Sequence, residues 1–172
     1  DMGVKLAEVV NNQGFVSQKR RDHAGALRCY EGCEAVCRAR LAALPKDAPR
    51  PLRLLELVGL GAANTGNVLT ETGHHAEAER AYLRSLEARQ ALAEAHPTVV
   101  RYRLQLGQTY SSLGDARRLL GRDAEALAAL GEARSTFEGL IARDPDDVDA
   151  RGRLARTLNT IGCIRDDREE HR

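Results

Sequence analysis

Apolar residues recur along most of the chain at intervals of three and four positions, the spacing of amphipathic helices. No segment alternates apolar and polar residues, and β-branched residues are sparse. The pattern therefore predicts an all-α protein with seven helices and no strands. We expect the helices at about residues 3–20, 22–44, 52–72, 74–96, 98–120, 122–143 and 147–166.

Polar residues at the helix ends support these boundaries. Asp22 and Thr98 are suitable N-caps, because a short side-chain oxygen can accept a hydrogen bond from a free helix N–H. The acids of the turn at 144–147 suit the N-terminus of the last helix. The Pro-rich run at 45–51 predicts a rigid connection, and we expect the charged residues 166–172 to fray.

The segment from Gly66 to Pro97 returns twice with its landmarks at fixed offsets. Counting from Gly66, a second Gly lies at +7, Ala at +10 and +12, Tyr at +16, Ser at +19 and Pro at +31. Counting from Gly114 gives Gly, Ala, Ala, Leu, Ala and Pro, and counting from Gly14 gives Arg, Ala, Ala, Tyr, Cys and Pro. A fourth origin is Gly162. Self-similarity at this period predicts a helical repeat array.

Each offset has a physical role. The first Gly allows one helix to approach its neighbour, and Tyr or Leu at +16 supplies bulk between the two helices. Gly73 and Gly121 stand where a helix ends and the chain reverses, a left-handed position that Gly occupies without strain. The Ala residues at +10 and +12 and the small residue at +19 let the second helix close on the first. Pro at +31 stops the second helix.

The landmarks resemble those of the tetratricopeptide repeat family. The third copy matches its order of aromatic, Leu-Gly, Ala, large residue and Ala at Tyr110, Leu113-Gly114, Ala126, Leu130 and Ala133. The second copy matches at Thr65-Gly66, Ala78, Tyr82 and Ser85. The period is 48 residues instead of 34, about two extra turns for each helix. The residue pattern of the repeat also resembles that of long-helix repeat regions attached to large bacterial signalling proteins such as Ser/Thr kinases.

This resemblance implies a right-handed α-solenoid whose first helices line a concave groove. Carried over by position, the groove offsets are −3, +1 and +4 from each repeat Gly. The residues expected to bind a peptide or partner domain are Asn11, Phe15, Gln18, Asn67, Thr70, Ser111, Asp115, Arg118 and Asn159; Ala63, Cys163 and Asp166 occupy the remaining offsets.

Composition narrows the class of partner. The 172 residues carry 26 basic and 25 acidic side chains, a balance that argues against a nucleic-acid or membrane surface. No apolar run approaches a membrane span, and no signal-peptide pattern opens the chain. We expect a cytoplasmic protein. One helical-repeat domain over 1–172 is expected, with repeats at about 3–45, 52–97 and 98–145 and a partial repeat at 147–172, in a fragment of a longer protein.

Three cysteines, Cys29, Cys33 and Cys37, form a stripe with a spacing of four residues. The outer pair lie ~12 Å apart along a helix, too far for one zinc ion to bind both. Cys33 occupies the small +19 position, so core packing is the favoured interpretation and a metal or redox site is an alternative.

Other candidates for chemistry have structural explanations. His74 and His75 begin a helix where other copies have unrelated residues, and His96 is a cation at a helix end. Gly59-Leu-Gly61 lacks the strand and acidic partner of a dinucleotide site, and close helix packing explains it. Arginines at 101, 103, 117, 118, 151, 153 and 156 could grip an acidic peptide or form solvated faces.

The sequence therefore predicts a non-catalytic scaffold without cofactors that binds a protein or peptide. One alternative is self-association through exposed terminal helices. The other is the metal or redox site on the cysteine stripe.

Overall fold

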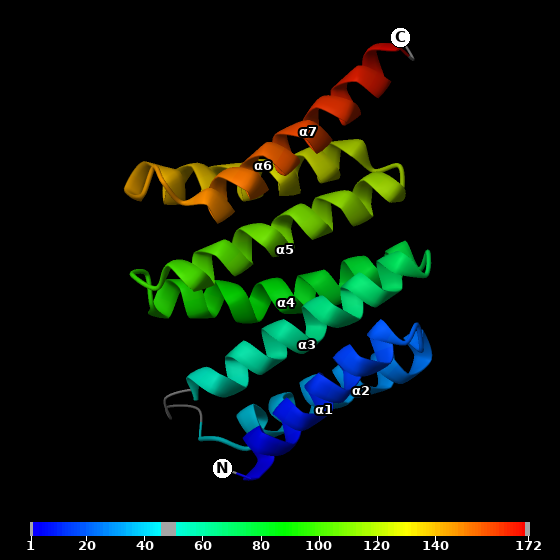
Figure 1. The fold of residues 1–172 in the computed structure, drawn as a ribbon, viewed down its shortest axis with the longest axis vertical. Helices are drawn as coiled ribbons and strands as arrows, with labels where there is room; N and C mark the ends of the chain where they lie inside the picture. Colours follow the sequence, from blue (N-terminus) through cyan, green and yellow to red (C-terminus); the bar gives the residue numbers. More distant parts are fainter. Residues whose placement is uncertain (1, 46–50, 171–172) are drawn as a thin grey trace. The chain divides into compact units, whose positions relative to one another are not determined.

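The computed structural model describes residues 2–45 and 51–170, with side chains as far as residue 166. These residues form seven α-helices and no strand, which confirms the all-α prediction (Figure 1). The helices are α1 (Met2–Lys19), α2 (His23–Ala42), α3 (Leu52–Glu71), α4 (His75–Ala95), α5 (Val100–Leu119), α6 (Asp123–Arg143) and α7 (Val148–Glu170).

Most helix ends lie within two residues of their predicted positions, and α7 is the exception. It continues to Glu170, so the prediction that the helix frays from residue 166 is wrong for its backbone. The final run contains Arg and Glu, which are good helix formers, and no Gly or Pro to end the helix. Residues 171 and 172, and most of the predicted connection at 45–51, lie outside the described residues.

The chain divides into two compact units, 1–92 and 93–172. In the first unit, α2 packs against both α1 and α3, and α1 and α3 also touch. One apolar cluster joins these helices to α4 and includes Ala7, Cys33, Leu54 and Ala88. In the second unit, α6 packs against both α5 and α7, and α5 and α7 touch. The same arrangement, with two first helices in contact beside one second helix, therefore occurs in both units.

The turn between paired helices has the same hydrogen bonds in all three copies. The backbone N–H groups of Asp22, His74 and Arg122 each donate to the carbonyl five residues earlier, at 2.9, 2.8 and 2.9 Å. This is the Schellman arrangement, which needs a left-handed residue at the turn. Gly73 has φ +80° and Gly121 has φ +71°, as predicted. In the first copy this position is Arg21, the only described non-glycine residue with positive φ, at 60°.

Each repeat glycine lies where two helices approach closely, as predicted, and the structure shows that it faces the +16 residue. A Cβ built on Gly14 would lie 2.7 Å from Tyr30 Cε1, and one on Gly66 would lie 2.5 Å from Tyr82 Cε1. A Cβ on Gly114 would lie 2.6 Å from Leu130 Cγ. The motif at 59–61 is likewise a packing site, because a Cβ on Gly61 would lie 3.0 Å from the carbonyl oxygen of Tyr30. The small residues let α1, α3 and α5 approach the helix that follows each of them, and Gly61 lets α3 approach α2.

The two alanines that recur in each copy differ in burial. The +12 residues, Ala26, Ala78 and Ala126, are completely buried. The +10 residues, Ala24, Ala76 and Ala124, are all exposed, so the prediction that they pack between the helices is wrong. Two residues turn a helix by roughly 200°, which puts +10 and +12 on opposite faces. The small +19 residues, Cys33, Ser85 and Ala133, are completely buried, as predicted.

One of the two predicted N-caps, Asp22, is correct, and an acid of the turn at 144–147 also caps a helix. Asp22 Oδ1 accepts from the Gly25 N–H at 2.8 Å, and Asp147 Oδ1 accepts from the Ala150 N–H at 2.9 Å. Thr98 is not a cap, because α5 begins two residues later and its N-cap is Val99, which has no side-chain acceptor.

Candidate binding surface

In the first unit, polar side chains of α1 and α3 meet where the two first helices lie side by side (Figure 1). Gln18 Nε2 donates to Glu71 Oε1 at 3.0 Å, and Asn64 Nδ2 donates to Asn11 Oδ1 at 3.3 Å. Gln18 Oε1 also accepts from the Tyr30 hydroxyl at 3.0 Å. Burial, together with nearby Cys29 and Glu71, raises the pKa of Tyr30, so this hydroxyl remains a donor.

A cavity of about 450 Å³ opens beside these contacts at the C-terminal ends of α1 and α3. Two of its lining residues, Phe15 and Gln18, are predicted binding residues. Phe15 is 55% exposed, and Lys19 Nζ lies 5.2 Å from the centre of its ring. The cavity is also lined by Lys19, Arg21, His23 and Glu71, which sequence reasoning missed as binding candidates. The sequence signal that could have identified these four residues is their position at the end of a predicted helix or in the turn that follows it.

The other predicted residues of this unit differ in exposure. Asn67 is exposed, and its Oδ1 accepts from the Tyr82 hydroxyl at 2.9 Å. Thr70 is half-buried, and its hydroxyl donates to the Gly66 carbonyl at 2.9 Å and lies 3.2 Å from the Tyr82 hydroxyl. Asn11 is only 7% exposed, so this side chain joins α1 to α3 instead of facing a ligand.

In the second unit, the predicted residues of α5 face polar residues of α7. The Ser111 and Thr157 hydroxyls lie 2.9 Å apart. A small cavity of about 80 Å³ lies beside them, lined also by Asp115, Arg153 and Arg156. Burial raises the pKa of Asp115, against the opposing effects of Arg118, Arg156 and a hydrogen bond with Thr160. Arg118 and Asn159 are exposed.

Two residues of the cysteine stripe, Cys33 and Cys37, are completely buried and belong to the apolar cluster of the first unit. The pKa of Cys33 is raised, mainly by its hydrogen bond with Cys37 and secondly by burial. Cys29 is half-buried, and all four cysteines are free thiols. Among the described residues, no group of three or more His, Cys, Asp or Glu side chains is placed to hold a metal ion.

The two histidines at the start of α4 differ, because the Nδ1 of His75 is buried without a hydrogen-bond partner among the described residues. His74 is exposed, and its Nδ1 lies 3.1 Å from the Thr72 hydroxyl. His75 is half-buried in the first turn of α4. His96 stacks at a tilt on Tyr102, with ring centres 5.9 Å apart.

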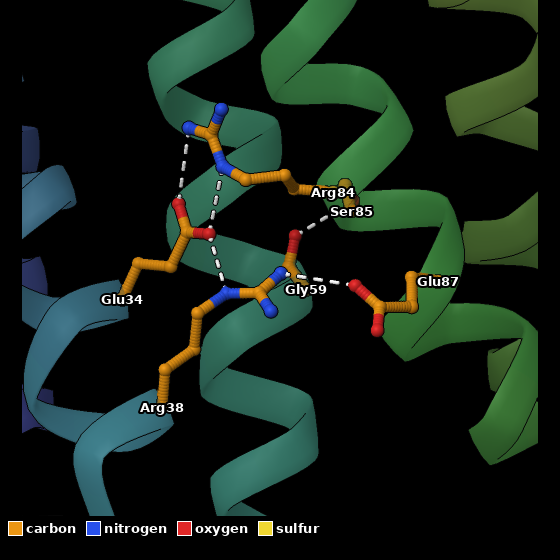
Figure 2. A network of polar contacts seen from close by, with 6 residues as sticks. All are labelled: Glu34, Arg38, Gly59, Arg84, Ser85 and Glu87. Carbon is orange, nitrogen blue, oxygen red and sulfur yellow. Dashed lines mark hydrogen bonds and ion pairs between the residues drawn. The ribbon is translucent and has the colours of Figure 1, made fainter. Parts of the chain in front are cut away.

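An ion-pair network centred on the buried carboxylate of Glu34, shown in Figure 2, joins α2 to α4 across α3. The side chain of Glu34 is 6% exposed, and its Oε1 accepts hydrogen bonds from the Nε atoms of Arg38 and Arg84, both at 2.8 Å. Arg38 also reaches Glu87, at 3.3 Å. Beside the network, the Ser85 hydroxyl donates to the Gly59 carbonyl at 2.8 Å. The four-residue spacing of Glu34 and Arg38 suggests the local pair, but only the packing of α2 near α4 brings in Arg84.

Comparison with known proteins gives no relative: no family model matches the sequence, and no curated protein is significantly similar to it. Among the described helices, none is both long enough and apolar enough to cross a membrane.

Proposed function

We propose that this chain is a non-catalytic scaffold of the tetratricopeptide repeat type, whose first helices bind an extended peptide or a partner domain. The observation that carries the proposal is the side-by-side packing of first helices, α1 with α3 and α5 with α7, in both units. Surfaces formed by adjacent first helices are where repeat arrays of this kind hold their ligands.

The chemistry of these surfaces supports a peptide ligand. The Asn67 carboxamide uses its oxygen for Tyr82, so its Nδ2 donor is the end available to a ligand carbonyl. Phe15 offers an exposed ring beside the 450 Å³ cavity. Arg118 offers a guanidinium that can hold a carboxylate in a two-pronged contact. Backbone carbonyls, an apolar side chain and an acidic group are all features of a peptide.

A peptide-display selection on the immobilised chain tests the proposal. Peptides selected from a random library are measured by fluorescence polarisation against three variants. Asn67→Asp keeps the acceptor for Tyr82 and removes the amide donor, and Arg118→Gln removes the cation. Arg134→Gln is the matched control, because this α6 arginine is 50% exposed and pairs with Glu138 away from the first helices.

Losing one hydrogen bond or ion pair to a ligand weakens binding by about 10-fold. We therefore expect a peptide bound by the first unit to lose about this factor with Asn67→Asp and a peptide bound by the second unit to lose it with Arg118→Gln. Both kinds of peptide should bind Arg134→Gln unchanged. Selected peptides that bind all three variants equally would refute the proposed surface.

A further inference from the structure

Helix α1 exposes a straight row of side chains that the proposed ligand surface does not use. Its members lie at intervals of four, three, four and three residues, which places them on one face of the helix. We refer to Met2, Leu6, Val9, Gln13 and Val16 as the α1 stripe. Its four apolar members are 86%, 54%, 52% and 48% exposed, in chain order. An exposed row that is apolar at four of its five positions marks an interaction surface.

The repeat shows what covers this face elsewhere in the chain. At the same offsets from Gly66, α3 carries Leu54, Val58, Gly61, Thr65 and Val68, and all five are buried. The helix that covers them is α2: Val68 packs with Ala26 and Tyr30, and Leu54 and Val58 pack with Cys33 and Cys37.

The second unit repeats this packing. At the same offsets from Gly162, α7 carries Ala150, Leu154, Thr157, Ile161 and Ile164. Ile161 and Ile164 pack with Ala126 and Leu130 of α6. Ala150 and Leu154 pack with Phe137 and Leu140 of α6. In both cases the covering element is the second helix of the preceding pair.

The charges beside the α1 stripe indicate the kind of helix that fits it. Lys5, Lys19 and Arg20 are exposed along its edge and its C-terminal end. The one acid of α1, Glu8, is already paired with Arg53 at 2.7 Å. A second copy of α1 would bring the same positive charges against this edge, and like charges disfavour such a pair. A helix with acidic flanks would be attracted to it.

From the repeat positions and these charges, we propose that the α1 stripe is a docking surface for an amphipathic helix with acidic flanks. The helix binds as α2 binds α3 and as α6 binds α7. This surface is separate from the ligand surface proposed above. Gln13 is the one polar member of the stripe, and its counterpart in α7 is Ile161, so Gln13→Leu should strengthen docking.

The test presents α6 to α1 in the register that it has with α7. Helix α6 carries four acidic and two basic residues, so it has the required charge. The test protein consists of residues 98–148 followed directly by residues 1–172. Residue 148 lies 14 positions before the repeat glycine Gly162, and residue 1 lies 13 positions before the repeat glycine Gly14. Joining residue 148 to residue 1 therefore places α1 after α6 at the same offsets at which α7 follows it. The readout is hydrogen exchange of the α1 backbone amides in the fused and parent chains.

We expect exchange in α1 to slow by roughly 10-fold or more in the fused chain, because the terminal helix gains an apolar cover. Leu6→Glu should abolish this gain and leave the parent chain almost unchanged. The matched control, Leu83→Glu, replaces a leucine of similar exposure on α4 (44%) and should keep the gain. Equal exchange in fused and parent chains would overturn the proposal, whether or not the added pair folds.

Light scattering on the parent chain tests the choice of occupant. A mass that stays near 18.8 kDa at all concentrations agrees with a partner helix. A dimer that Leu6→Glu dissociates would assign the stripe to a second copy of the chain and overturn the assignment to an acidic helix.

Discussion

Replacing Gly66 by Ala tests the contact on which the repeat interpretation depends. In a helix interior, Ala is more favourable than Gly by about 1 kcal/mol. At this position, however, the new Cβ would lie 2.5, 2.7 and 2.9 Å from three ring carbons of Tyr82. Tyr82 is only 3% exposed, and its hydroxyl is held near Asn67 and Thr70, so the ring has little freedom to move.

The magnitude follows from these two opposing effects. Overpacking a close-packed interior costs about 1–3 kcal/mol, which exceeds or cancels the helix-propensity gain. We therefore expect Gly66→Ala to lower the free energy of unfolding by about 0–2 kcal/mol. Gly139→Ala is the matched control, because Gly139 is exposed in the interior of α6 and a Cβ there meets nothing within 4 Å. This control should raise the free energy of unfolding by about 0.5–1 kcal/mol.

Urea unfolding followed by circular dichroism measures both variants and a double-mutant cycle with Tyr82→Ala. Without the ring, Gly66→Ala should stabilise the chain by about as much as Gly139→Ala does. A Gly66→Ala variant that stabilises the wild-type background as much as the control would refute the contact. So would a cycle with no coupling between Gly66 and Tyr82.

Three further predictions concern the positive-φ turn residue Arg21, the ion pairs of the buried Glu34 and the half-buried Asp115. Arg21→Gly should raise the free energy of unfolding by about 0.5–1 kcal/mol in urea titrations, because Arg21 holds the positive φ that the equivalent glycines hold without strain; no gain would contradict the shared turn. Glu34→Gln should lower the free energy of unfolding by about 1–3 kcal/mol, because two arginines lose their buried partner. Glu87→Gln is the control: this acid is 70% exposed, so its replacement should change the free energy of unfolding by less than about 0.5 kcal/mol. Because burial raises the pKa of Asp115, its ionisation destabilises the fold as pH rises through the folded-state pKa. Asp115→Asn should therefore raise the melting temperature at pH 7. This difference between variant and wild type should vanish as pH falls toward 3.8, the pKa of the carboxyl in the unfolded chain. A difference in melting temperature that does not depend on pH would exclude ionisation of Asp115 as its cause.

The sequence alone determined the helices, their pairing and the contacts that recur in every copy. Gly at the origin with Tyr or Leu at +16 identified the closest approach between paired helices, because only a residue without Cβ fits there. Gly73 and Gly121 marked left-handed turns for the same reason. These features are local or repeated, so each copy confirms the others and one chain is sufficient to find them.

Only the tertiary structure decided which side of each helix is covered. Ala at +10 and Ala at +12 are the same residue in every copy, but one faces solvent and the other is buried. Asn11 looked like a ligand contact by position, yet the approach of α3 buries it. Leu6 and Val9 look like core residues by composition and remain exposed, because none of the described helices covers that face of α1. Burial depends on the neighbours that a helix meets, and a pattern along one helix does not contain them.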